Sequence, residues 1–109
     1  MSSRRRDNPI ETRIPYKAVL AFAQKLWPDK PSTASNISSV TQEIIREYPS
    51  YIFSGKSKAG IIGGLFYLLS LVYDQPRTQK EIANLMNSSI VTIRASYYEW
   101  QRILAKKRT

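Results

Sequence analysis

The chain lacks two residue types that most catalytic and metal sites use, because its 109 residues include no cysteine and no histidine. Without cysteine there is no disulfide, no thiol nucleophile and no thiolate metal site. Without histidine there is no imidazole ligand, and the commonest general base is missing. The few acidic residues are scattered or suited to helix capping, and there is no glycine-rich phosphate loop. We therefore expect that the chain is not an enzyme and that it binds no metal and no cofactor.

Long hydrophobic runs are also missing. The longest apolar stretch covers residues 59–73, fifteen residues that include three glycines, whereas a membrane-spanning helix needs about 20 residues. Residues 1–6 are polar and basic and do not form the apolar segment of a signal peptide. These patterns predict an intracellular chain without membrane association.

Acidic residues are scarce relative to basic ones, with 8 against 17 and a net charge of +9. The excess is uneven along the chain. Residues 1–20 carry +3, residues 21–54 carry none, and residues 55–109 carry +6 from nine basic and three acidic side chains. A concentrated positive charge favours polyanionic partners, nucleic acid first. Charge alone leaves a simple solubility surface as an equal alternative.

The hydrophobic pattern predicts one all-α domain. Residues 1–13 show no periodicity and are expected to form a flexible basic arm or linker, which leaves residues 14–109 as the domain. Apolar residues recur with a helical period, and no segment alternates with period two. Five helices are therefore expected, at residues 15–27, 32–48, 58–73, 78–86 and 90–106.

Glycine and proline positions refine this prediction. The third helix is apolar nearly all round, as a central helix should be. Its Gly60, Gly63 and Gly64 are unfavourable for a helix, and we infer that they let neighbouring helices approach closely. Pro28 and Pro31 are expected to end the first helix.

The stretch 78–105 has the outline of a helix-turn-helix. Thr78 and Glu81 form a capping-box pattern, which predicts the start of a short helix. Residues 87–89 (NSS) form a three-residue turn, in which Asn87 tolerates the left-handed conformation and Ser89 can cap the next helix. In such motifs the second helix enters the major groove of DNA.

The last helix divides into two faces at about 100° per residue. One face is expected to pack on the core: Ile90, Ile93, Tyr97, Trp100 and Leu104. The other face offers Val91, Ala95, Tyr98 and Arg102, with Arg94 at its margin. Arginine can bond guanine bidentately and small apolar groups can touch the thymine methyl, whereas Arg102 is better placed for phosphate. The alternative is an ordinary exposed helix face, since helix-turn-helix shapes also occur in protein–protein modules.

Three motifs resemble the second cyclin repeat of the archaeal transcription factor B and eukaryotic TFIIB family. Residues 54–61 (SGKSKAGI) resemble its S-G-K-S-P-x-G-I, residues 77–83 (RTQKEIA) its R-T-Q-x-E-[IV]-A, and residues 91–94 (VTIR) with Tyr97 its V-T-[IV]-R-x-x-Y. Residues 14–26 also resemble the first helix of that repeat. The motifs occur in the family's order and spacing.

The resemblance implies a five-helix cyclin-like fold that ends in a helix-turn-helix. It implies a general transcription initiation factor that binds double-stranded promoter DNA upstream of the TATA box, at the B-recognition element, together with TATA-binding protein. Such a chain would act in the archaeal cytoplasm at the nucleoid, or in the nucleus of a eukaryote. The family's zinc ribbon and first repeat are absent, so we expect no recruitment of RNA polymerase by this chain alone.

The family motifs also suggest which residues contact DNA. Base contacts are expected from Val91, Thr92 and Arg94. Backbone contacts are expected from a set of basic residues: Lys56, Lys58, Arg77, Lys80 and Arg102. The chain departs from the family's pattern at Lys58, a usual proline, and at Ile90, a usual acidic residue. We therefore expect a DNA preference that differs from that of better-known members.

Two other functions fit part of the sequence. A cyclin-fold protein–protein adaptor could use the basic face for an acidic partner, but it would have no need of the motif at residues 91–94. Other helix-turn-helix regulators usually dimerise, and the apolar faces identified above are all assigned to one core. We therefore expect a monomer.

Overall fold

The computed structural model describes residues 16–48 and 57–107, and these form five α-helices without a strand. The helices are α1 (Tyr16–Leu26), α2 (Pro31–Glu47), α3 (Lys58–Val72), α4 (Gln79–Met86) and α5 (Ile90–Lys107). The all-α, five-helix prediction is confirmed, and each helix boundary falls within one residue of the expected one. Pro15, Lys56 and the predicted arm at residues 1–13 lie outside the described residues.

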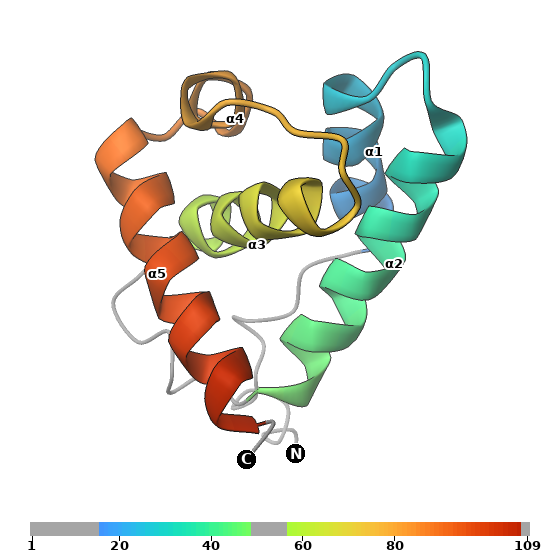
Figure 1. Ribbon diagram of the computed structural model, residues 1–109. Helices are drawn as coiled ribbons and strands as arrows, with labels where there is room; N and C mark the ends of the chain where they lie inside the picture. Colours follow the sequence, from blue (N-terminus) through green and yellow to red (C-terminus); the bar gives the residue numbers. More distant parts are fainter. Residues whose placement is uncertain (1–15, 49–56, 108–109) are drawn as a thin grey trace, which may run out of the picture.

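The apolar helix α3 lies at the centre of the molecule (Figure 1), with α5 on one side and α1 and α2 on the other. It has a buried residue on every side, because each neighbouring helix covers part of its surface. Its Leu65 and Phe66 are completely buried. The Phe66 ring contacts the ring of Trp27, the residue that follows α1, in an edge-on arrangement with 6.0 Å between the ring centroids. The central position expected from the sequence is therefore confirmed.

Two glycines of α3 allow α5 to approach closely. A β-carbon on Gly64 would lie 2.5 Å from the Cβ of Ser96 and 2.8 Å from its carbonyl carbon. A β-carbon on Gly63 would instead meet the terminal methyl of Ile93. Backbone therefore packs on backbone at Gly64, which confirms the inference that the glycines permit close helix packing.

This contact turns α5 slightly from the expected orientation. Ser96 is buried and Ile90 is 37% exposed, so the expectation that Ile90 packs on the core was wrong. Ile93 and Trp100 are completely buried as expected, and Tyr97 is half-buried against Tyr67. The small Ser96 fits opposite Gly64, where a larger side chain would hold the helices apart.

The end of α1 is fastened to the segment that leads into α4. The indole nitrogen of Trp27 donates to the Gln75 carbonyl at 3.0 Å. The Arg77 Nε donates to the Leu26 carbonyl at 2.7 Å, and its guanidinium lies 5.7 Å from the centre of the Trp27 ring. These contacts join residues about fifty positions apart and fix where the helix-turn-helix begins.

Pro31 was expected to help end the first helix, but it starts the second. It occupies the first turn of α2, where the missing N–H of proline costs nothing and its fixed φ suits the helix. Pro28 follows the end of α1 as expected. Asp74, which follows the end of α3, adopts a left-handed φ of 58°.

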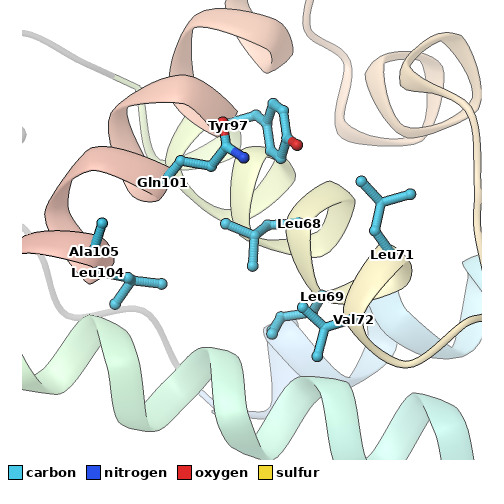
Figure 2. A pocket seen from close by; sticks show the side chains of 8 residues that line it. All are labelled: Leu68, Leu69, Leu71, Val72, Tyr97, Gln101, Leu104 and Ala105. Carbon is cyan, nitrogen blue, oxygen red and sulfur yellow. The ribbon is translucent and has the colours of Figure 1, made fainter. Parts of the chain in front are cut away.

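An open apolar hollow lies between the C-terminal halves of α3 and α5 (Figure 2). Leu68, Leu71 and Val72 line it from α3, and Tyr97 and Leu104 line it from α5. Val72 is 67% exposed. The monomer prediction assumed that one core buries every apolar face, and the exposed residues of this hollow do not fit that assumption. The monomer itself stays a prediction. Within the described ranges, no helix is long and apolar enough to cross a membrane.

Candidate nucleic-acid interface

A capping box starts the first helix of the helix-turn-helix. The Glu81 amide donates to the Thr78 hydroxyl at 3.0 Å, and the Thr78 amide donates to the Glu81 carboxylate at 2.8 Å. The two residues satisfy backbone amides that α4 would otherwise leave unpaired. Behind this cap, Ile82, Ala83 and Met86 are buried, so α4 is held firmly at its start and along one face.

The turn between α4 and α5 is closed by caps at both of its ends. Asn87 adopts the left-handed conformation, with φ 56° and ψ 48°. The Ser88 amide donates to the Ala83 carbonyl at 2.8 Å, as in a Schellman motif. The Ser89 hydroxyl then accepts from the Thr92 amide at 3.1 Å and caps α5. The predicted roles of Asn87 and Ser89 are confirmed, and the turn fixes the angle between the two helices.

The solvent-exposed face of α5 contains most of the residues expected to contact bases. Val91 is 71% exposed and Tyr98 is 58% exposed. Arg94 and Ala95 are also exposed between them. Because Ile93 and Trp100 are buried on the opposite side of α5, this face can enter a DNA groove along about two turns of helix.

Thr92 lies differently from its neighbours Val91 and Arg94. It is half-buried, its hydroxyl accepts a bond of 2.9 Å from Ser89, and its methyl lies 2.8 Å from where a Gly60 β-carbon would be. These contacts give Thr92 a role in the start of α5 and in its packing on α3. A base contact by Thr92 stays a prediction.

Arg94 is bonded to the other helix of the motif. Its Nε donates to the side-chain oxygen of Gln79 at 3.2 Å. Glu99, which lies on the same helix as Arg94, forms an ion pair with Arg102. Arg94 is therefore not neutralised by a carboxylate among the described residues.

The residues expected to contact the DNA backbone fall into two groups. Lys58 and Lys80 are exposed in the first turns of α3 and α4, and the Gly60–Thr92 contact brings the first turn of α3 next to the first turn of α5. Arg77 and Arg102 are engaged with other residues. Arg77 donates to the Leu26 carbonyl at the end of α1 and to the Pro76 carbonyl, and Arg102 forms an ion pair with Glu99. Lys56 lies outside the described residues.

Sequence reasoning missed two residues of this region, Gln79 and Ser96. Gln79 lies fifteen positions before Arg94, so only the angle between α4 and α5 brings the two side chains together. Ser96 was passed over because a serine contributes nothing to an apolar stripe. The glycines of α3 were the available signal, since a glycine in a central helix indicates a close neighbour.

Comparison with known proteins gives a consistent result. The family model described as "Transcription factor TFIIB repeat" matches residues 15–103. "Transcription initiation factor IIB 2" of Thermoplasma acidophilum is 33% identical over 99 residues, which cover 90% of this chain and 31% of that protein. "Transcription initiation factor IIB" of Methanopyrus kandleri is 37% identical over 79 residues, which cover 72% of this chain and 24% of that protein.

The chain spans about a third of the length, or less, of these curated relatives. No solved structure gives a significant match to it.

Proposed function

Because the chain belongs to the TFIIB repeat family of transcription initiation factors, we propose that it binds promoter DNA upstream of the TATA box by placing α5 in the major groove. The observation that carries the proposal is the division of α5 into two faces. Ile93 and Trp100 are completely buried, while Val91 and Arg94 are exposed at the start of the helix. The start of the second helix is where helix-turn-helix proteins contact base edges.

The chemistry of this face suits base recognition. A guanidinium can donate two hydrogen bonds to O6 and N7 of guanine, and the Val91 methyls can contact a thymine methyl. Lys58 and Lys80 lie at helix starts, where backbone amides also favour anions. They would bind phosphates and set the position of α5 without contributing sequence preference.

The partners follow from the three motifs that resemble the second repeat of the family. We propose that the chain acts as such a repeat and binds DNA in complex with TATA-binding protein. We propose that this chain by itself makes no contact with RNA polymerase. The relatives are transcription initiation factors rather than enzymes, and an enzymatic role has no support from the residues of α4 and α5.

The experiment that tests the proposal is a selection of DNA. Duplexes with randomised sequence upstream of a TATA box are selected for binding to the chain, with and without TATA-binding protein. The proposal predicts an enriched sequence directly upstream of the TATA box. Selection without any enrichment in both conditions would contradict it, and enrichment only with TATA-binding protein would make that partner essential.

Arg94→Ala is expected to cost about 1–3 kcal/mol on the selected sequence and to relax the base preference at one position. Binding to unrelated DNA should fall much less, because one of 17 basic residues has been removed. Stability should change by less than about 0.5 kcal/mol, since the side chain is exposed. The measurement compares wild type and variant on selected and scrambled sequences. Equal losses on both would make Arg94 a backbone contact, and no loss on either would remove it from the site.

Lys58→Ala is expected to weaken binding to selected and scrambled DNA alike. The slope of log affinity against log salt concentration should fall by roughly 0.9, the value for one lost phosphate contact on duplex DNA. Lys17→Ala is a matched control, because Lys17 is exposed on the first turn of α1. An unchanged slope for Lys58→Ala would place this lysine off the DNA.

A further inference from the structure

Arg94 and Gln79 connect the two helices of the helix-turn-helix through their side chains. The Arg94 Nε donates to the Gln79 Oε1 at 3.2 Å. An arginine side chain has only donors, so the oxygen of the glutamine amide must be the atom that faces it. The orientation of the amide is therefore fixed by chemistry.

Gln79 is itself well placed to hold another side chain. It is the first residue of α4 and is half-buried. It directly follows Thr78, whose amide and hydroxyl are both bonded to Glu81 in the capping box. The acceptor oxygen is thus attached to a backbone position that the capping box fixes.

The bond leaves the outer edge of the Arg94 guanidinium available. Of the five N–H donors of an arginine, the one on Nε is used by Gln79. The two terminal nitrogens make no hydrogen bond to any residue in the described ranges. That terminal edge can form the parallel pair of bonds that guanine accepts.

We propose that Gln79 is a specificity-determining positioning residue, which holds Arg94 in its base-contacting orientation before DNA is bound. The inference rests on the proposed function, because it requires Arg94 to contact a base. An arginine that is already ordered loses less conformational freedom on binding, and ordering a long side chain at an interface typically costs a factor of about 2–10 in affinity. Gln79 would therefore raise the affinity by this factor only for DNA in which Arg94 contacts its preferred base.

Gln79→Leu tests this directly, because leucine has a similar size and no acceptor. The measured quantity is a discrimination ratio between two DNA sequences. It is the affinity for the selected sequence divided by the affinity for the same sequence with one base pair changed, namely the pair at which Arg94→Ala is expected to relax the base preference. Gln79→Leu should lower this ratio by about 2- to 10-fold. It should leave the melting temperature and the salt slope unchanged. Gln24→Leu, at an exposed glutamine of α1, is the matched control and should change none of these.

Two further variants show whether Gln79 acts through Arg94. Gln79→Glu keeps an acceptor oxygen and should preserve the ratio, while its negative charge weakens binding to all DNA. In an Arg94→Ala background, Gln79→Leu should have no further effect on the ratio. An equal effect in both backgrounds would overturn the proposal, because Gln79 would then act by its own contact.

The failure of this inference is distinguishable from failure of the proposed function. If Arg94→Ala lowers the ratio and Gln79→Leu does not, only the positioning role is lost. If Arg94→Ala leaves the ratio unchanged, both the base contact and the positioning role are lost.

A measurement without DNA adds an independent check. The Arg94 Nε–H proton should exchange slowly with water in the wild-type protein and rapidly in Gln79→Leu. Equal exchange in both proteins would overturn the proposal.

Discussion

Trp100→Ala is expected to lower the free energy of unfolding by about 3–5 kcal/mol, the usual cost of removing a large buried aromatic side chain. Trp100 is completely buried, its ring meets Tyr48 edge-on at 5.8 Å, and its indole nitrogen donates to the Ile61 carbonyl at 3.1 Å. The variant therefore creates a cavity and also leaves a buried carbonyl without this donor. Urea denaturation followed by circular dichroism measures the loss.

Tyr98→Ala provides the control for Trp100→Ala. Tyr98 is an aromatic residue of the same helix and is 58% exposed, so its removal should cost far less than that of a buried ring. Equal stability of Trp100→Ala and wild type would mean that α5 is turned differently. In that case the exposed face at Val91 and Arg94 would be wrong as well.

Gly64→Val is the second substitution with a large expected effect, about 3 kcal/mol or more of lost stability, at or beyond the upper end of typical overpacking costs. Even the first added carbon would lie 2.8 Å from the backbone of Ser96, which cannot move unless α5 moves. The branched side chain adds two further carbons at the same place. Thermal and urea denaturation should both show the loss.

Ala95→Val controls for the weak helix propensity of valine, because Ala95 is exposed on α5 and the difference in propensity is well under 1 kcal/mol. Gly63→Ala gives an intermediate case, since its new β-carbon would meet the flexible end of Ile93. A Gly64→Val protein as stable as Ala95→Val would contradict the close packing of α3 on α5.

The sequence was sufficient to predict the helices and the turn of the motif, because their causes are local. The capping box at Thr78, the left-handed residue Asn87 and the cap Ser89 each act on neighbouring backbone groups. The central position of α3 was also predictable, because a helix that is apolar nearly all round is typical of the centre of a bundle. Its last turn is the exception, since Leu71 and Val72 are exposed.

The exact rotation of α5 was not predictable from hydrophobicity. Ile90 is more apolar than Ser96, yet Ser96 is buried and Ile90 is partly exposed. The deciding factor is the space opposite each residue, and that space is set by Gly64 on a different helix. The bond between Gln79 and Arg94 depends in the same way on the angle between two helices.

The contact between α1 and the segment before α4 limits how far the molecule can be shortened. A fragment that begins after α2 retains every residue assigned to base contact, but it lacks the Leu26 carbonyl that binds Arg77 and the Trp27 ring beside the guanidinium. It also lacks the indole that bonds the Gln75 carbonyl. The start of α4 would then keep its packing on α3 but lose its contacts with the end of α1. We therefore expect that transferring the specificity of the helix-turn-helix to another protein requires α1 and α3 as well as α4 and α5.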